Sequence, residues 1–461
     1  MRRDRLALAG LAVLALAGAV AAAQEKAPAF DREAQVGPDP VLPEPQNYLL
    51  PPMNIARAVG WKQGESPSVP DDMRIRLYAN GLAHPRMVHA LPNGDVLVVE
   101  SKAPGTEPIQ RPKDVIQGYI KSFASTSQGS TPAQAGGGEG NRITLLRDAD
   151  GDGTPEVRSV FLDHLHSPFG VALVGNDLYV ANTDALVRYP YTPGETRMTA
   201  PGTVLTELPG GPIDHHWTKA LTASPDGTKL YVGVGSNSNI TEHGLDVERE
   251  RAAVWEIDRS SGAHRLFAEG VRNPTGLAFE PQSGRLWAIA NERDEIGPHL
   301  VPDYLTSLQD GGFYGWPYSY YGQHLDPRVR PQRPDLVARA IPPDYALGSH
   351  VAPLGLVFSP GGGGGALPAR YAGGAFIGEH GSWDRPDLSG YKVVFVPFEN
   401  GRPSGKAQDV VTNFLNGQGE SRGRPVGVTL DRTGALLIAD DTGDTVWRVT
   451  SAQTNTAATG R

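Results

Sequence analysis

A short unit that recurs along this chain constrains its fold more than any other feature. Its clearest copy covers residues 271–295. A polar corner containing Arg272 and Asn273 leads into the apolar stretch 275–279, a Pro/Gly turn reverses the chain, and the apolar run 286–290 ends at a second polar corner. Short apolar runs bounded by Gly, Pro, Asn and Asp are typical of β-strands, so the unit predicts a β-hairpin with polar residues at both ends.

Five weaker copies of the unit are found, over residues 84–100, 167–182, 216–234, 352–379 and 424–440. Their spacing of roughly 50 to 85 residues suits four-stranded blades with loop insertions. From about residue 73 onward helical periodicity is nearly absent. The repeat therefore predicts an all-β fold, a six-bladed β-propeller. A pair of β-sandwich domains would explain the strands but not the recurring unit.

The segments that flank the repeats have distinct compositions. Residues 1–23 combine a basic start, an apolar stretch and a small-residue cleavage site, which predicts a signal peptide and a periplasmic or secreted protein. The apolar run is about 15 residues, shorter than the ~20 that a membrane span needs, so we expect no membrane span in the mature protein. Residues 24–74 predict an extended Pro-rich arm, 75–450 the propeller, and 451–461 a disordered tail.

Composition excludes several classes of function. The 461 residues contain no cysteine, which rules out disulfides and thiolate metal sites. The formal net charge of −9 argues against nucleic acid as a partner. In a chain that is acidic overall, any local cluster of cations is informative.

Cationic and imidazole side chains recur at one position of the unit. In a propeller, the corner before the first strand of each blade (the first corner) and the corner after its second strand (the second corner) lie on one face. Taken singly, each side chain is explained as well by solvation or by core packing. Together they predict a pocket for a small polyanionic ligand. The first corners hold His84 and Arg86, His164 and His166, His215 and His216, Arg272 and Asn273, His350, and Arg422 and Arg424.

The second corners carry carboxylates and amides. Such oxygen donors beside a cationic ring suit a hard divalent ion, most naturally calcium, and a nearby imidazole suits a general base. Ordinary turn chemistry explains the same residues. These corners span residues 100–102, 182–184, 236–239, 291–295, 379–384 and 440–444.

A separate acidic motif contains Asp148, Asp150 and Asp152. Their spacing is that of a calcium loop, but Ser159 stands where an EF-hand has glutamate, and Pro155 disfavours a following helix. We expect a hairpin turn clipped by a structural calcium ion. The alternative is an Asp/Gly turn without metal.

An aromatic cluster lies between residues 312 and 321, with Phe313, Tyr314, Trp316 and three further tyrosines. It predicts either a wall on which a sugar or a quinone stacks, or the packing of a long loop on the propeller.

The ordered set of motifs resembles the soluble PQQ-dependent glucose, aldose sugar and sorbosone dehydrogenases, over about residues 73–450. The stretch from Arg272 to Phe279, followed by 294–296, carries this resemblance. The further motifs at 291–294, 311–317 and 378–382 are most similar to the L-sorbosone dehydrogenase branch. The resemblance implies a six-bladed propeller that binds PQQ through calcium at the top of its channel.

The resemblance also implies roles for individual residues. His216 matches the general base, although the neighbouring His215 leaves the assignment open by one residue and Ala220 stands where the family has arginine. The implied catalytic residues are His216 and Arg272; the cofactor residues are Arg272, Asn273, His350, Arg424 and either His380 or Arg385 in place of a family lysine; and the ligands of the PQQ calcium are Asn291, Glu292 and Asp294.

The sequence therefore predicts a periplasmic quinoprotein that oxidises a sugar or a sugar-derived aldehyde, of aldose or sorbosone type, by hydride transfer to PQQ. Since no haem attachment motif is present, a separate quinone, cytochrome or other acceptor is expected to take the electrons. A metal-dependent propeller lactonase is the alternative from another enzyme class, and a propeller that only binds a ligand is the non-enzymatic one.

Overall fold

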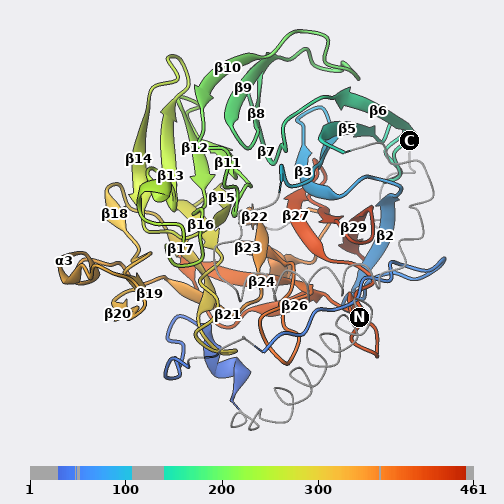
Figure 1. The fold of residues 1–461 in the computed structure, drawn as a ribbon. Coiled ribbons are helices and arrows are strands. Elements are labelled where there is room, and N and C mark those ends of the chain that lie inside the picture. Colours follow the sequence, from blue (N-terminus) through green and yellow to red (C-terminus); the bar gives the residue numbers. More distant parts are fainter. Residues whose placement is uncertain (1–29, 47, 49–51, 106–139, 363–364, 453–461) are drawn as a thin grey trace, which may run out of the picture. The chain divides into compact units, whose positions relative to one another are not determined.

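Six β-sheets form the body of residues 35–461, and Figure 1 shows them arranged as blades around a common axis. The predicted six-bladed β-propeller is confirmed. This computed structural model describes residues 30–46, 48, 52–105, 140–362 and 365–452. The predicted signal peptide and most of the predicted tail lie outside the described residues. Residues 1–34 form a separate unit, whose described part contains most of the short 3-10 turn η1 (Arg32–Gln35).

Each copy of the repeat supplies the two innermost strands of one sheet. The first sheet contains β3 (Pro85–Ala90), β4 (Val96–Glu100), β5 (Arg142–Arg147) and β6 (Val157–Leu162). The second contains β7 (Gly170–Val174), β8 (Asp177–Ala181), β9 (Ala185–Pro190) and β10 (Thr203–Glu207). The third contains β11 (Leu221–Ala223), β12 (Lys229–Val234), β13 (Ala253–Asp258) and β14 (His264–Glu269), with β18 (Gly312–Phe313) at its outer edge.

The other three sheets follow the same order. The fourth contains β15 (Pro274–Phe279), β16 (Leu286–Ala290), β17 (Pro302–Ser307) and β21 (Tyr345–Ser349), with β1 (Val36–Gly37) outside them. The fifth contains β22 (Pro353–Ser359), β23 (Gly374–Glu379), β24 (Lys392–Glu399), β25 (Arg402–Pro403) and β26 (Gln408–Val411). The sixth contains β27 (Pro425–Leu430), β28 (Leu436–Asp440), β29 (Thr445–Ser451) and β2 (Met73–Ala79).

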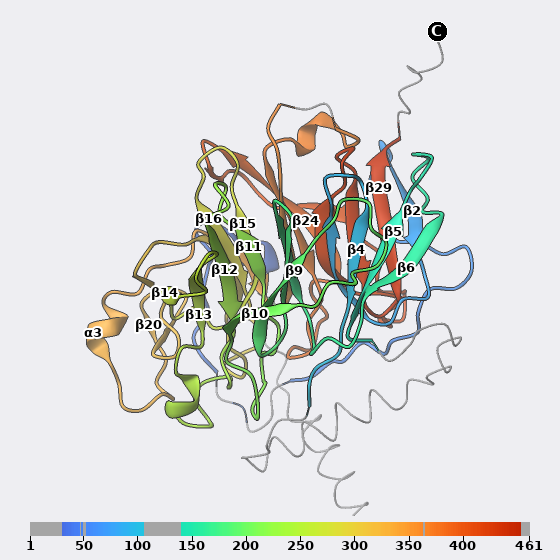
Figure 2. The same ribbon diagram turned by 90° about the horizontal axis from the view of Figure 1, so that it is seen from above.

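Short elements lie outside the blades. The segment between β17 and β21 carries the ribbon of β19 (Ser319–Tyr320) and β20 (His324–Leu325) and the single helical turn α3 (Pro334–Val337). In both ribbon views this segment projects to the side of the third and fourth sheets (Figures 1 and 2). The turns η2 (Asp246–Glu248) and η3 (Ala369–Tyr371) complete the set of described elements.

The ring closes between the two ends of the propeller. Strand β2, which precedes the first blade in sequence, pairs antiparallel with β29, the last strand. The sixth sheet is thus built from both ends of the domain. Closure removes the sheet-to-sheet gap that an open array would leave exposed.

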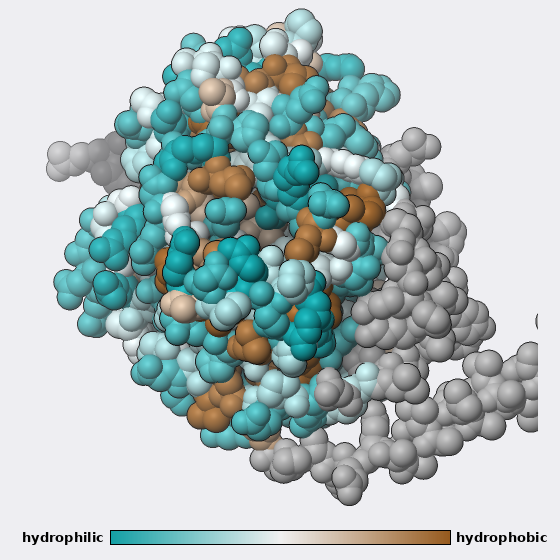
Figure 3. Space-filling model, turned by 60° about the vertical axis from the view of Figure 1, so that its left-hand side comes forward, coloured by the Kyte–Doolittle hydropathy of each residue, from teal (hydrophilic) through white to brown (hydrophobic). Residues whose placement is uncertain are grey.

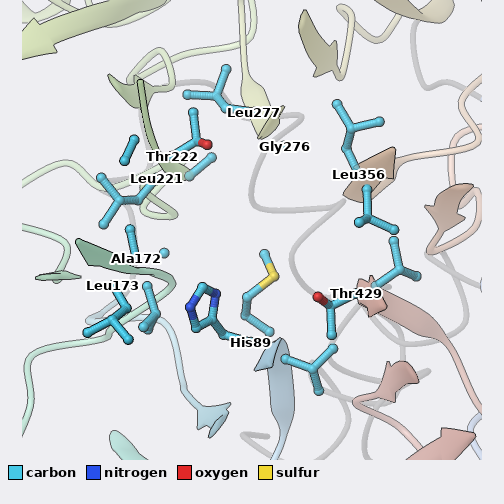
Figure 4. A pocket seen from close by; sticks show the side chains of 17 residues that line it. His89, Ala172, Leu173, Leu221, Thr222, Gly276, Leu277, Leu356 and Thr429 are labelled. Carbon is cyan, nitrogen blue, oxygen red and sulfur yellow. The ribbon is translucent and has the colours of Figure 1, made fainter. Parts of the chain in front are cut away.

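The innermost strands of all six sheets line a central cavity of about 310 Å³ (Figure 4). Its walls are mainly apolar, and His89 of β3 is the imidazole that lines it. Burial lowers the pKa of His89 to about 4, so this ring is neutral at physiological pH.

A bulge at the start of the inner strand recurs in four blades. The pairing register shifts just after Pro85, Pro274, Pro353 and Pro425. Proline has no N–H to give to the ladder, and a bulge turns the following side chains relative to the sheet. In these four blades, the same proline and bulge therefore orient the side chains of the first corner.

The first and second corners lie together, as the repeat predicted. In five blades a backbone N–H of the second corner donates to a carbonyl of the first corner. These bonds are Ser101 to His84 at 3.1 Å, Thr183 to His166 at 3.0 Å, Asn291 to Asn273 at 3.1 Å, His380 to Ala352 at 2.9 Å, and Asp441 to Arg424 at 3.2 Å. One face of the propeller thus gathers the polar residues of both corners.

The core lies between neighbouring sheets. The second strands are buried along their whole length, as in β4, β16 and β28. Trp287 of the fourth sheet packs edge-on against Phe358 and Phe398 of the fifth, with ring centroids 6.4 and 5.0 Å apart. Apolar area removed from water in this way stabilises the ring of blades.

The N-terminal arm has little regular structure before β2. Ala58 forms an isolated bridge with Ser421, and the indole nitrogen of Trp61 donates to Asp440 at 2.7 Å. Within the described residues, no helix has the length and apolar character that a membrane crossing requires. The face drawn in Figure 3 is largely hydrophilic, with apolar residues in small separate groups.

Candidate active site

His216 stands at the first corner of the third blade, just before β11. Its Nδ1 lies 2.9 Å from the carbonyl oxygen of Ser236 and 3.0 Å from the hydroxyl of the same residue. A carbonyl oxygen only accepts, so Nδ1 carries the hydrogen and Nε2 keeps its lone pair. Burial, and then the charges of His215 and Arg272, hold the pKa of His216 well below its usual value. The ring is therefore a neutral base at physiological pH.

Gly235 allows His216 and Asn273 to approach each other. A Cβ at position 235 would lie 2.4 Å from His216 Cβ and 2.5 Å from Asn273 Oδ1, closer than real Cβ contacts. Asn273 Oδ1 is buried and has no hydrogen-bond partner among the described residues. The base and an unsatisfied amide oxygen thus flank one glycine.

Asp441 of the sixth blade gathers cations from three blades. It forms an ion pair with Arg86, and His380 Nε2 lies 3.0 and 3.1 Å from its two carboxylate oxygens. Burial acts to raise the pKa of Asp441, but His380, Arg86 and Arg424 hold it far below its usual range. Asp441 is therefore ionised at any physiological pH. We call Arg86, His380, Arg424 and Asp441 the cationic cluster.

Two donors of the cationic cluster have no partner. Arg86 Nε and Arg424 Nε are buried without a hydrogen-bond acceptor among the described residues. Arg86 also lies over the ring of Trp217, 5.8 Å from its centroid. This contact joins the first corners of the first and third blades. Buried, unpaired guanidinium donors are costly unless an acceptor meets them. The cluster is thus equipped to bind an anion.

Arg272 binds the protein through all three guanidinium nitrogens. It donates to the Glu292 carbonyl at 2.7 Å, to Asn239 at 3.0 and 3.2 Å, and to Asp294 at 3.3 Å. Only 2% of the residue is exposed. Its main contribution is to fix the second corners of the third and fourth blades and to place a positive charge beside the base.

Asp294, His350 and Asp384 bring ligand atoms within 4.8 Å of one another, an arrangement that could hold a metal ion. We call these three the acidic cluster. His350 Nδ1 lies 3.5 Å from Asp294, and Nε2 faces the Gly297 carbonyl at 3.1 Å. Burial opposes a charge on His350, but Asp294, Asp384 and Asp303 prevail and raise its pKa to about 9.

Asp384 supplies the atom that most clearly lacks a partner. Its Oδ2 accepts the backbone N–H of Glu295 at 3.1 Å, whereas the buried Oδ1 has no hydrogen-bond donor among the described residues. Burial and the neighbouring Asp294 raise the pKa of Asp384 to about 7. Crowded, desolvated carboxylates favour a bound cation, so the donor set fits a divalent ion.

Comparison with known proteins identifies the family of the chain. The family model described as TrAA12-like matches residues 138–301 and 335–452. The chain belongs to the TrAA12-like family. A protein of Borreliella burgdorferi, described as uncharacterized, is 26% identical over 295 residues, which cover 62% of this chain and 76% of that protein.

Two solved structures share the fold of this TrAA12-like chain, both with a TM-score of 0.66. The holo form of the pyranose dehydrogenase PQQ domain from Coprinopsis cinerea is 20% identical and covers 85% of this chain and 98% of its own. The calcium structure of the Trichoderma reesei family AA12 enzyme is 18% identical and covers 88% and 99%. The resemblance found in the sequence is confirmed at the level of family and fold.

The TrAA12-like chain places some predicted site residues outside the clusters. Glu292 pairs with the buried Arg293 at 3.2 Å, and Asn291 Nδ2 donates to the Pro353 carbonyl at 2.8 Å. Of the three predicted calcium ligands, only Asp294 joins the acidic cluster. Arg385 donates to the Ser349 carbonyl at 2.9 Å, so His380 is the member of that alternative pair in the cationic cluster.

The predicted calcium loop forms a second group of carboxylates. Asp148, Asp150 and Asp152 lie with Glu156 in the turn between β5 and β6, their ligand atoms within 4.8 Å of one another. Several of their oxygens accept backbone N–H groups of the turn, for example Gly151 to Asp148 at 2.7 Å. The turn is an ordered acidic loop on the outer half of the first blade.

Sequence reasoning placed Arg86, Asp384 and Asp441 within the polar corners but assigned none of them an individual role. All three stand in corners that the repeat identified, and Asp441 directly follows the second strand of its blade, as Asn291 does in the fourth. The repeat marked their positions. Their partners lie in other blades, which the repeat does not specify.

Proposed function

We propose that this chain is an exported quinoprotein oxidoreductase that oxidises a sugar or a sugar-derived aldehyde with PQQ and calcium. The observation that carries the proposal is His216, a neutral base with a free Nε2, next to a cationic cluster whose buried donors lack an acceptor. The names of the solved structures that share the fold, a PQQ domain of a pyranose dehydrogenase among them, support the same reading.

His216 would take the proton of the substrate hydroxyl on Nε2. The Ser236 carbonyl fixes the tautomer from behind and stabilises the imidazolium that forms. Arg272 lies close enough to lower the pKa of His216 and so keeps the base unprotonated before reaction. PQQ, when bound, would accept the hydride from the substrate carbon that carries this hydroxyl.

The cationic cluster would hold the carboxylates of PQQ. Arg86 Nε and Arg424 Nε offer charge-assisted hydrogen bonds, and His380 stands beside them on Asp441. Carboxylates match the two buried guanidinium donors, which lack an acceptor among the described residues. A hydrolase would need no such pair of buried guanidinium donors without acceptors, which disfavours the lactonase alternative.

The acidic cluster would hold the calcium ion. Asp294 and Asp384 provide carboxylate oxygens. Oδ1 of Asp384 is available as a ligand because it is buried without a hydrogen-bond donor among the described residues. A divalent ion held there would compensate the charge of the two carboxylates. This ligand set replaces the one expected from sequence, in which Asn291 and Glu292 were included.

The substrate and the electron acceptor are proposed by class. We propose an aldose or a sorbosone-type aldehyde as substrate, and a separate quinone, cytochrome or other carrier as acceptor. The signal-like residues 1–23 support a periplasmic or secreted location.

The test is reconstitution of the full mature chain with PQQ and calcium, followed by dye-linked reduction with a panel of aldoses and sorbosone. We expect turnover that requires both additions. His216→Gln should retain PQQ binding, measured by quenching of protein fluorescence, while turnover is lost. Absence of any PQQ-dependent reduction across the panel would overturn the proposal.

A further inference from the structure

The aromatic cluster of residues 312–321 does not form a wall of the site. Tyr314 and Trp316 are 1% and 3% exposed. The Tyr314 hydroxyl donates to the Ser307 carbonyl at 2.6 Å, and the Trp316 indole to the Asn239 carbonyl at 3.0 Å. The rings of Tyr314 and Trp316 pack the loop onto the propeller, so these two residues offer no sugar-stacking surface.

Tyr48 of the N-terminal arm is the exposed aromatic side chain. It is 37% exposed, whereas every other aromatic side chain among the described residues is buried or half-buried. An exposed aromatic ring in a water-soluble chain either is incidental or serves as a contact surface. The position of Tyr48 next to the acidic cluster favours a contact surface over incidental exposure.

The arm is tied to the acidic cluster on both sides of Tyr48. The Gln46 N–H donates to the carbonyl of Ile296, two residues beyond Asp294, at 2.9 Å. Further along, the Asn54 N–H donates to the carbonyl of Trp383, directly before Asp384, at 3.0 Å. Gln46 is therefore anchored to the loop of one carboxylate and Asn54 to the loop of the other.

Gln46 also connects Tyr48 to His350. A Cβ placed on Gly297 would lie 3.8 Å from Gln46 Cβ, so Gln46 packs directly over this glycine. The Gly297 carbonyl faces His350 Nε2 at 3.1 Å, and the Tyr48 hydroxyl donates to the side-chain oxygen of Gln46. Two hydrogen bonds and one packing contact thus connect His350 of the acidic cluster to the phenol.

The phenol senses the acidic cluster electrostatically. Burial of part of the ring, and then the charge of Asp384, raise the pKa of Tyr48. The ring therefore lies within reach of the Asp384 charge and is still 37% exposed to solvent. That is the placement of a residue at the mouth of a site.

We infer that Tyr48 is a substrate-contacting residue, whose ring packs against the C–H face of a sugar at the mouth of the site. The inference rests on the proposed function and adds its specificity element. Aromatic rings offer a large, rigid contact area with a polar end, which suits a ligand with both C–H faces and hydroxyls. The arm thereby becomes part of the substrate site as well as a cover of the propeller.

The experiment compares Tyr48→Ala, Tyr48→Phe and Tyr48→Trp in the full chain loaded with PQQ and calcium. We expect Tyr48→Ala to raise KM for the best sugar of the panel by roughly tenfold while kcat changes less than about twofold. Phe and Trp should restore KM because they keep a ring. Val204→Ala, a truncation of an exposed side chain on the outer strand β10, serves as the matched control.

Each outcome has one meaning. An active wild type with an unchanged KM in Tyr48→Ala overturns the inference and leaves the proposed function standing. A joint fall of kcat and PQQ affinity in Tyr48→Ala also overturns it, since the residue would then support the cofactor site. A wild type without PQQ-dependent turnover overturns the proposed function and, with it, the sugar contact.

Discussion

His216 Nδ1 lies 2.9 Å from the carbonyl oxygen of Ser236, a residue of the second corner of the same blade. The two residues are 20 positions apart, and the strands β11 and β12 bring them together. Because Ser236 Oγ itself donates to the Ser238 carbonyl at 2.6 Å, both groups facing Nδ1 act as acceptors. The blade thus sets the tautomer of the imidazole, and the lone pair of Nε2 is what remains for chemistry.

Substitution of His216 tests its role as base. We expect His216→Ala to lower kcat by about 10²–10⁴, the usual contribution of a general base, with PQQ affinity within a few-fold of wild type. Equal turnover in the variant would remove the residue from the mechanism. His215→Ala should retain most of kcat and so separates the two neighbouring histidines.

The pH profile of kcat tests the same assignment independently. A base acts in its neutral form, so activity falls as pH drops through its pKa. Since the pKa of His216 is well below 6.5, we expect the acid limb of the profile below that value. His215 lowers the pKa of His216, so His215→Ala should move the acid limb to higher pH. An acid limb that moves to lower pH contradicts this arrangement.

Asp441→Asn tests the centre of the cationic cluster. Asparagine keeps the shape but leaves the Arg86 guanidinium without a buried counter-charge, so we expect a loss of about 3–5 kcal/mol in the free energy of unfolding at pH 7. The folded-state pKa of Asp441 is depressed, so its stabilisation exists above the unfolded pKa and is lost as pH falls through the folded one. The difference from wild type should therefore persist down to about pH 4, near the ordinary Asp value.

Urea titrations of wild type and Asp441→Asn measure this difference. Asp409→Asn is the matched control, because its pair with Lys392 is much more exposed, 54% for Asp409 and 32% for Lys392, and exposed pairs contribute little. The pKa of His380 gives a second readout. Asp441 raises it against the effect of burial, so it should fall in the Asp441→Asn variant.

The sequence was sufficient for the blades and for the polarity of the corners, but not for the partners within the site. The inner strands follow from alternation of short apolar runs and turns, which is local information. Arg86 and Asp441 are 355 residues apart and meet only because the ring closes. His380 and Asp384 share one corner, yet one belongs to the cationic cluster and the other to the acidic cluster. Which way a side chain points in a loop depends on tertiary contacts.

The acidic cluster and the acidic loop of Asp148, Asp150 and Asp152 predict two distinguishable calcium sites. Asp384→Asn should weaken one site by at least about tenfold, since it removes the ligand oxygen without a partner. Asp150→Asn should weaken the other, and there we expect loss of the calcium-dependent rise in Tm with little effect on turnover. Isothermal titration of chelator-treated protein counts the sites. Two intact sites in Asp384→Asn would remove the acidic cluster from the calcium ligands.

Lys219 makes the stability of the fold depend on pH. Lys219 follows Thr218 in the sequence, and its side chain is fully buried. Its Nζ donates to the Trp217 carbonyl at 3.1 Å. Burial, and then the charge of Arg251, lower its pKa from 10.5 to about 7. The folded state therefore binds fewer protons than the unfolded state between these values, and stability falls as pH drops from about 10.5 to 7. Below pH 7 the cost is constant.

Methionine has a similar length and no charge to desolvate. Lys219→Met should therefore raise the free energy of unfolding at pH 7 by roughly 3–5 kcal/mol, and the gain should shrink towards pH 10.5. Urea unfolding from pH 7 to 10.5 measures it. Lys229→Met, in the same blade, is the control: Asp258 raises the pKa of Lys229, so its replacement should not stabilise the protein. A gain in Lys219→Met that does not vary with pH would assign the effect to packing and contradict the titration argued here.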